Sequence, residues 1–155
     1  MLIQALSEAH DRKGFDCGDT DLNRWFSQIA KQHKNKGVSS TFVAVNHLGS
    51  AQVLGYYALS LAELLHADLP LAQRKRLPAK VPVYRLGRLA IDKAQQGQHI
   101  GEFLLFDAID RVTRIAQEVG GVGLIVDAKP SAVGFYQRFG FDQMTDHPQH
   151  LFLPL

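Results

Sequence analysis

Residues 83–128 constrain the fold of this 155-residue chain more than any other stretch. They begin with a strand-like run at 83–91, pass through a polar loop, and continue with an amphipathic helix pattern from about Ile100 to Gln117. A nearly all-apolar run at 120–128 follows, which is typical of a buried strand. A strand, a helix and a strand in this order imply a right-handed crossover and a locally parallel pair of strands.

The predicted helix carries one apolar stripe and one charged side, so we expect the stripe to pack into the core. The stripe consists of Leu105, Ile109, Val112, Ala116 and Val119, and it is widened by Leu104, Ala108 and Ile115. The charged residues on the other side are Glu102, Asp110, Arg111 and Arg114.

The N-terminal part predicts another amphipathic helix, over residues 19–33, which Asp19 or Thr20 can cap. Its apolar positions recur at helical spacing and are Leu22, Trp25, Phe26 and Ile29. Because Trp25 lies on this stripe, we interpret it as a core residue rather than as a base-stacking one.

Two strand-like runs follow, at 40–46 and 52–61, and the turn residues between them indicate a hairpin. The proline-flanked segment 69–82 predicts a short surface helix or a loop. In the next strand Gly87 indicates a bulge or a close approach of the backbone to another group.

The C-terminal part predicts a short helix and a last strand or hairpin arm. Pro130 and Ser131 open the helix, and Gly140 ends it with a left-handed cap. Residues 141–153 supply the final strand or arm. Since no repeat or linker interrupts the chain, we expect residues 1–155 to form a single domain with a mixed α/β sheet.

Composition excludes several classes of protein. An apolar fraction of 46% and a charged fraction of 21% are those of a globular protein. No run reaches the roughly 18 apolar residues of a membrane span, and the N-terminus lacks a secretory signal. Cys17 is the single cysteine, which leaves no disulfide and no thiol cluster for zinc. We therefore expect a cytoplasmic protein without a metal, and we expect Cys17 to pack as a small apolar group rather than as a lowered-pKa thiol.

The loop 95–101, QQGQHIG, turns abruptly into the apolar helix. A helix that starts there presents its unpaired N–H groups and the positive end of its dipole, and such a position favours phosphate. Gly97 and Gly101 leave room for a ligand beside the backbone, and the donors Gln96, Gln98 and His99 surround them. The loop is neither a Walker loop nor a dinucleotide fingerprint. An ordinary connecting loop remains the alternative to a phosphate cradle.

Basic residues gather in three places although the net charge is only +2. The clusters are 31–37, then 74–76 with Lys80, and 84–93. Clustering of this kind presents an electropositive face to phosphates, whereas solvated surface residues are the alternative for any single cluster. Together the clusters favour a polyanionic ligand.

Two motifs in the C-terminal half resemble the GCN5-related N-acetyltransferase (GNAT) family. RLAIDKAQQGQHIGEFLL is similar to the Q/R-x-x-G-x-G/A loop that binds the pyrophosphate of acetyl-CoA in that family, with Gln96 first and Gly101 last. His99 replaces the middle glycine, and we expect it to have a helical or β-region φ, which histidine accepts. The signature A-x-x-F-Y-x-x-x-G-F is matched by Ala132, Phe135, Tyr136, Gly140 and Phe141.

The resemblance implies a GNAT fold, with a mostly antiparallel sheet of about six to seven strands and helices on both faces. It implies that acetyl-CoA is the co-substrate and binds at Gln96, Gly97, Gln98, His99, Ile100, Gly101 and Phe135. It also implies that the backbone of Leu89, Ala90 and Ile91 holds the pantetheine arm and polarises the acetyl carbonyl. Tyr136 is then the general acid for the departing sulfur. A core role beside Phe135 and Phe139 is the alternative for Tyr136.

The N-terminal half narrows the resemblance. FDCGDTDLNRWF at 15–26, the basic helix end, VLGYYALS and VYRLGRLAID are similar to the acetyltransferase toxins of bacterial toxin–antitoxin modules. Toxins of this group acetylate the amino group of aminoacyl-tRNA and block translation, and a ribbon-helix-helix antitoxin neutralises them. The resemblance therefore implies aminoacyl-tRNA and such an antitoxin as partners, while a homodimer stays open.

The strand at 83–91 offers no carboxylate as a general base, because Asp92 falls where the chain leaves the strand. An α-amino group has a pKa near 8, and esterification of its carboxylate removes a charge that favours the ammonium form. Such an amine is substantially neutral at pH 7, whereas a lysine amine with a pKa near 10.4 needs a base. The missing carboxylate thus favours an aminoacyl ester over a lysine side chain.

Arg85 and Arg88 are predicted to bind phosphates of the RNA acceptor end. A second predicted RNA-binding patch consists of Lys31, Lys34 and Lys36. Simple exposure to solvent is the alternative for both. Two other functions stay open, which are an N-acetyltransferase for a small amine or a protein N-terminus, and a non-catalytic module that binds CoA or RNA.

Overall fold

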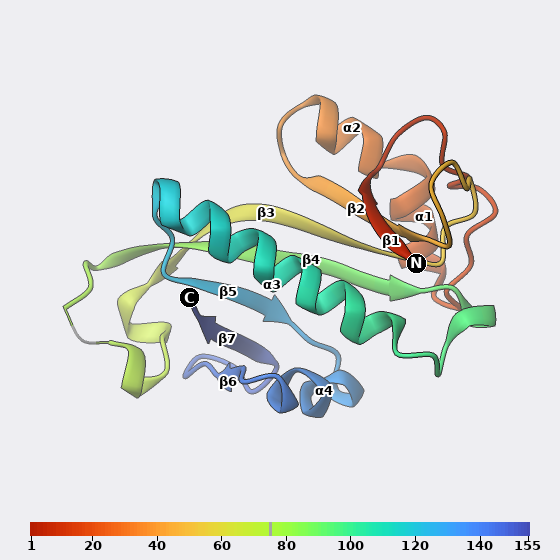
Figure 1. Ribbon diagram of the computed structural model, residues 1–155. Helices are drawn as coiled ribbons and strands as arrows, with labels where there is room; N and C mark the ends of the chain where they lie inside the picture. The colour runs from red at the N-terminus through yellow and green to blue at the C-terminus, as the bar shows by residue number, and fades with distance from the viewer. Residues whose placement is uncertain (75) are drawn as a thin grey trace. The chain divides into compact units, whose positions relative to one another are not determined.

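The computed structural model describes residues 1–74 and 76–155 and contains a seven-stranded mixed sheet (Figure 1). The strands are β1 (Leu2–Ala5), β2 (Ser40–Val45), β3 (Gly55–Leu65), β4 (Lys80–Ile91), β5 (Gly123–Asp127), β6 (Asp142–Gln143) and β7 (His150–Pro154). Their order in the sheet is β1-β2-β3-β4-β5-β7-β6. Strands β4 and β5 pair in parallel, and the printed pairings of β1 with β2, β2 with β3, β5 with β7 and β6 with β7 are antiparallel. The predicted fold class is therefore confirmed.

The helices are α1 (Thr20–Gln28), α2 (Ala30–Asn35), α3 (Ile100–Val119) and α4 (Val133–Arg138). Short 3-10 turns lie at 66–68, 71–73, 93–95 and 130–132. Among the described residues, no helix has the length and apolar character that crossing a membrane requires. Two compact units make up the chain, and each is described separately: unit 1 contains 1–60 and 87–108, and unit 2 contains 61–86 and 109–155.

Unit 1 places helices on both faces of its strands, because neighbouring residues of β3 point to opposite sides. The ring of Tyr56 stacks on Phe26 of α1 with a centroid distance of 4.3 Å. The hydroxyl of Tyr57, one residue later, donates to the Asp107 carboxylate of α3 at 2.5 Å. The core of unit 1 also contains Phe15, Trp25, Ala30, Val43, Val45, Val53, Ala58 and Ala90.

The predicted helix over 19–33 is two helices in the structure. Asp19 caps the first, as predicted, and its side chain accepts hydrogen bonds from the N–H groups of Asp21 and Leu22. Ile29 separates α1 from α2 with a φ of −115°, far from the helical value near −63°. Trp25 is 5% exposed, so its predicted core role is confirmed.

Unit 2 shows why two glycines precede β5. A Cβ atom at Gly121, where φ is +119°, would lie 2.3 Å from the ring of Tyr84. The Tyr84 hydroxyl donates to the carbonyl of Gly120 at 2.6 Å. The ring of Tyr84 therefore leaves no room for a side chain at Gly121, and only glycine fits there. The core of this unit contains Leu69, Val81, Val83, Ile125, Met144 and Phe152.

Most predicted elements are confirmed, including the hairpin of β2 and β3, the parallel pair of β4 and β5, the short helix ended by Gly140 (φ +95°), and the last hairpin of β6 and β7. Strand β1 was not predicted. The predicted helix or loop at 69–82 contains a 3-10 turn at 71–73 and the first residues of β4.

One detail of the sequence prediction is wrong. Ile115 and Val119 are 39% and 75% exposed, because the last turns of α3 extend past the buried part of its stripe. At Gly87 a bulge or a close approach of the backbone to another group stays a prediction, and a Cβ atom there would meet no described atom of the chain within 4 Å.

Candidate active site

The loop before α3 contains two residues with left-handed backbone. Gly97 has a φ of +83° and His99 a φ of +62°. The expectation of a helical or β-region φ at His99 is therefore wrong. A non-glycine residue in the left-handed region costs roughly 1–2 kcal/mol. His99 thus adopts the conformation for which the family pattern has glycine.

The main-chain N–H groups of this loop are open. Within residues 1–74 and 76–155, the N–H groups of residues 97–102 donate to no acceptor, and the first amide of α3 with a partner is that of Phe103, which bonds the His99 carbonyl at 3.1 Å. Gln96, Gly97, Gln98 and His99 are exposed, Gly101 is half-buried and Ile100 is buried. Open amides at a helix start suit an anion such as a diphosphate.

Two side chains of the loop have polar partners elsewhere in unit 1. The amide of Gln96 donates to the carbonyls of Cys17 and Ile91, at 3.2 and 3.3 Å. The ring of His99 lies 3.1 Å from the Glu102 carboxylate. The role of these side chains as donors for a ligand therefore stays a prediction, and the amide of Gln96 already has two internal acceptors.

The predicted pantetheine strand lies at the end of β4. Ala90 is 5% exposed, and Leu89 and Ile91 are half-buried. The carbonyl of Ala90 would lie 2.9 Å from a Cβ atom at Gly55, so β3 approaches this end of β4 closely. The missing side chain of Gly55 lets the strands come this close.

Tyr136 lies in α4 and is 6% exposed. The rings of Phe135 and Phe141 contact it edge-on, with centroid distances of 5.2 and 5.4 Å. Burial raises the pKa of Tyr136 to about 12. Among the described residues, no hydrogen-bond partner of its hydroxyl is found. The phenol therefore stays protonated at neutral pH, and its proton is not committed to an internal acceptor.

Arg88, predicted to bind RNA, contacts an aromatic ring. Its guanidinium lies 4.3 Å from the ring centroid of Trp25, which is a cation–π contact. Arg88 is half-buried, whereas Arg85, at another position of β4, is exposed. Stacking of this kind fixes the direction of a guanidinium and leaves its N–H edge available to a phosphate.

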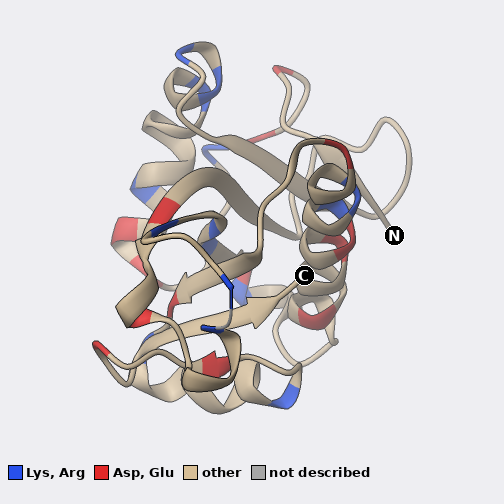
Figure 2. Ribbon diagram, turned by 90° about the vertical axis from the view of Figure 1, so that its left-hand side faces the viewer, with Lys and Arg blue, Asp and Glu red and all other residues tan. Residues whose placement is uncertain are grey.

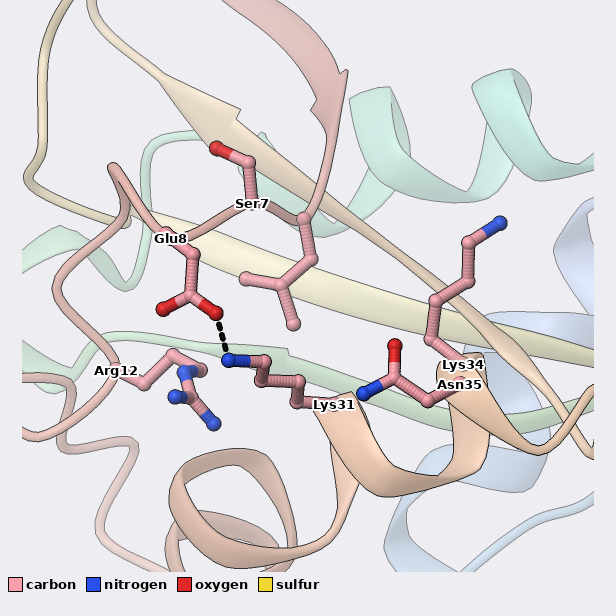
Figure 3. Close-up of a pocket in the computed structure, with 7 residues that line it drawn as sticks. Ser7, Glu8, Arg12, Lys31, Lys34 and Asn35 are labelled. Carbon is pink, nitrogen blue, oxygen red and sulfur yellow. Dashed lines mark ion pairs between the residues drawn. The ribbon is translucent and has the colours of Figure 1, made fainter.

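Two of the predicted RNA-binding lysines line a pocket of about 280 Å³ (Figure 3). The other lining residues are Leu6, Ser7, Glu8, Arg12 and Asn35. Lys31 forms an ion pair with Glu8, so its charge is partly balanced, and Arg12 donates to the carbonyl of Ser27 at 3.1 Å. Lys36 follows α2 as its C-cap and is exposed.

Helix α3 carries both acidic and basic residues, as Figure 2 shows. Lys75, which belongs to the predicted basic cluster 74–76, lies outside the described residues. In the same cluster Arg74 donates to the carbonyls of Leu69 and Ala67, which favours a structural role.

Sequence reasoning missed the residues that hold the candidate loop. Asp16 and Asn23 precede and begin the first helical region, and Lys93 follows β4, yet their side chains meet. The Asp-x-Gly sequence at 16–18 is a turn signal, but it does not reveal a partner so distant along the chain. Cys17 packs against the core of unit 1, and burial raises its pKa, so its predicted apolar role is confirmed.

Residues 71–150 match the family described as an acetyltransferase (GNAT) domain. The chain belongs to the GNAT acetyltransferase family. A curated relative, the tRNA-acetylating toxin of Mycobacterium tuberculosis, is 35% identical over 149 residues, which cover 96% of this chain and 88% of the relative.

Two solved structures of the toxin AtaT share the fold. AtaT complexed with acetyl-methionyl-tRNAfMet has a TM-score of 0.89 and 34% identity, and the match covers 99% of this chain and 94% of that chain. A tyrosine-to-phenylalanine mutant of AtaT, bound to the C-terminus of the antitoxin AtaR and to acetyl-CoA, has a TM-score of 0.80 and 31% identity. That match covers 99% of this chain and 92% of the other.

Proposed function

We propose that this protein transfers the acetyl group of acetyl-CoA to the amino group of aminoacyl-tRNA and thereby blocks translation as a toxin. The relatives support this substrate, because one is named as a tRNA-acetylating toxin and another was solved with an acetylated aminoacyl-tRNA. The sequence supports it independently, since no carboxylate on the strand before the loop is available to deprotonate a lysine.

The open amides of residues 97–102 carry the proposal. A diphosphate needs several donors and a favourable electrostatic field, and a helix N-terminus with unpaired N–H groups provides both. Because Gln96 and His99 have internal partners, the site binds a diphosphate through main-chain amides. In unit 1, residues 96–101 hold the diphosphate of acetyl-CoA, and Leu89, Ala90 and Ile91 hold its pantetheine arm. Phe135 of unit 2 is also proposed to bind acetyl-CoA.

The proposed reaction forms an amide bond and breaks a thioester. The neutral amine of the aminoacyl ester attacks the acetyl carbon, the C–S bond breaks, and the proton lost by the amine goes to water. The Tyr136 hydroxyl gives its proton to the departing sulfur and regains one from solvent. A pKa of about 12 keeps this hydroxyl protonated at neutral pH.

RNA binding is assigned to Arg85 and Arg88 and to the exposed lysines Lys31, Lys34 and Lys36. Arg88 is held by Trp25, so it can present its N–H edge with little loss of side-chain entropy. A ribbon-helix-helix antitoxin is the proposed partner, in line with the AtaT structure that contains the C-terminus of an antitoxin. The proposed location is the cytoplasm, where charged tRNA is found. A homodimer remains an option that sedimentation would test.

Mass spectrometry of tRNA esters tests the function. Purified protein is incubated with acetyl-CoA and total aminoacyl-tRNA, and the esters are then analysed for a gained acetyl group. We expect acetylated esters with the natural protein and a strong loss with Tyr136→Phe. If the protein binds CoA and acetylates free polyamines or protein N-termini instead, the small-amine function replaces this one. CoA binding without any product supports the non-catalytic module.

A further inference from the structure

The segment that begins the candidate diphosphate loop is attached to a distant part of unit 1. The N–H of Asp16 donates to the Asp92 carboxylate at 3.2 Å, and the N–H of Lys93 donates to the Asp16 carbonyl at 2.8 Å. The first of these bonds joins residues 76 positions apart in the sequence, and the second joins Asp16 to the residue after Asp92. The end of β4 therefore continues into a segment whose backbone path depends on residues 16–18.

The Asp16 side chain is the centre of this attachment. One carboxylate oxygen accepts from the N–H of Gly18 and from the amide of Asn23, both at 2.9 Å, and the other lies 3.0 Å from the Lys93 ammonium. These donors lower the pKa of Asp16 to about 2, with the Gly18 bond as the largest cause. Asp16 is therefore an anion at every physiological pH.

Further bonds extend the attachment toward the loop. Asn23 also accepts from the N–H of Cys17 at 2.9 Å, which fixes the Cys17 carbonyl, and that carbonyl accepts from Gln96 at 3.2 Å. The Asp92 carboxylate caps the short turn at 93–95 through the Ala94 N–H at 3.0 Å. These bonds thus hold the chain on the N-terminal side of the loop as far as Gln96, immediately before the open amides begin.

Among the described residues, the N–H groups of residues 97–102 have no acceptors, so their own hydrogen bonds do not hold this loop in shape and it needs support from other residues. The left-handed residues Gly97 and His99 do not provide it, since each is exposed. In the described part of the chain, the support consists of the residues around Asp16, which we name the Asp16 clamp: Asp16, Asn23, Asp92, Lys93 and Gln96.

We propose that Asp16 is a positioning residue for the binding of acetyl-CoA. Through Lys93 and Asn23, Asp16 holds the loop at 97–102 in the shape that receives the diphosphate. This inference rests on the proposed use of acetyl-CoA and adds a residue outside the GNAT loop motif. Asp16 contacts no reacting atom in this scheme. It acts on the part of the donor that carries phosphate and leaves the acetyl transfer itself unchanged.

Two acetyl donors separate positioning from general structural support. Asp16→Asn places an amide N–H against the Lys93 ammonium, so we expect the KM for acetyl-CoA to rise at least about tenfold. The kcat and the KM for aminoacyl-tRNA should change less than about twofold. With S-acetyl-pantetheine, which lacks the diphosphate, the natural protein and the variant should have equal KM values. A loss of similar size with both donors, or no loss with acetyl-CoA, overturns the proposal.

Variants at Lys93 test the same inference without Asp16→Asn, so the test does not depend on whether that variant folds. Lys93→Arg retains an ion pair with Asp16 and should keep the natural KM, whereas Lys93→Met should raise the KM for acetyl-CoA. Equal KM values for these two variants contradict the proposal.

Asp21→Asn is the matched control, since it removes a carboxylate from the exposed pair of Asp21 with Arg24 in α1. It should leave all kinetic constants unchanged. Calorimetric titration with CoA separates this inference from the proposed function. Absence of CoA binding by the natural protein defeats both, whereas equal binding by the natural protein and Asp16→Asn defeats the positioning role alone.

Discussion

Two buried tyrosines differ in what their hydroxyl groups do. The Tyr56 hydroxyl donates to the carbonyl of Leu22 at 2.9 Å, and its ring stacks between α1 aromatics in the core of unit 1. The Tyr136 hydroxyl, in unit 2, has no acceptor among the described residues. Desolvation is the largest cause of a raised pKa in both.

The comparison teaches that burial alone does not identify a catalytic phenol. Both groups are protonated at neutral pH, but the proton of Tyr56 is used to hold α1 on β3, whereas that of Tyr136 is available. Removing one hydroxyl at a time should therefore separate the two effects: loss of the Tyr56 hydroxyl should lower stability, and loss of the Tyr136 hydroxyl should lower kcat.

Tyr136→Phe has the largest expected effect. Loss of a general acid lowers kcat by roughly 10²–10⁴-fold. Stability should stay within about 0.5 kcal/mol, because no internal hydrogen bond is lost. Steady-state acetylation of aminoacyl-tRNA and urea unfolding measure the two quantities. The variant should also relieve growth arrest on expression. Full kcat in the variant would remove Tyr136 from the mechanism.

Tyr56→Phe should show the opposite pattern. It deletes the bond to Leu22, so we expect the free energy of unfolding to fall by about 1 kcal/mol. The kcat should stay within about twofold of the natural value. The same two assays serve as measurements, and a kcat loss as large as that of Tyr136→Phe would erase the contrast between the tyrosines.

Alkaline titration sharpens the comparison. An unfolded tyrosine loses its proton near pH 10, while folded Tyr136 keeps it to about pH 12. The folded state then binds more protons than the unfolded state, so stability falls as pH rises from 10 toward 12. Each Phe variant should remove part of this fall, as measured by urea unfolding at pH 9, 10 and 11. Activity should show no loss from Tyr136 ionisation below pH 10.

Phe135→Leu is expected to lower the free energy of unfolding slightly, by no more than Tyr56→Phe does. Phe135 is half-buried and contacts Tyr136 edge-on, and Arg138 lies 5.8 Å from its ring centroid. Removing such contacts costs about 0.5–1 kcal/mol. Thermal unfolding of Phe15→Leu provides the scale, because this variant removes an edge contact to Tyr56 from a buried site. A larger loss of stability for Phe135→Leu than for Phe15→Leu would contradict this expectation and show that the contacts of α4 contribute strongly to the stability of the protein.

Local patterns predicted the elements on which the site is built. The helix start at Ile100 followed from the change of polarity after Gly97, and the β4–β5 pair followed from the order of strand and helix. These features depend on residues close together in the sequence, so they can be predicted from one sequence.

Features that depend on distant residues or on individual torsion angles were not predictable. The break at Ile29 has no proline or glycine to indicate it. The left-handed φ of His99 overrides the preference of its residue type. The bond between Asp16 and Asp92 joins two segments that the sequence shows only as turns, because Asp is common in turns of every kind. The contacts of the Asp16 clamp are therefore evident from the structure and not from the sequence.

The open amides at residues 97–102 have a consequence for the lifetime of the protein. Because acetyl-CoA binds these groups in the folded form and not in the unfolded one, it stabilises the folded form by about 2.7 kcal/mol when it is present at a hundred times its Kd. Resistance to unfolding and proteolysis then follows the cell's supply of acetyl-CoA. Starvation for acetyl groups would deprive the protein of its acetyl donor and shorten its survival at the same time.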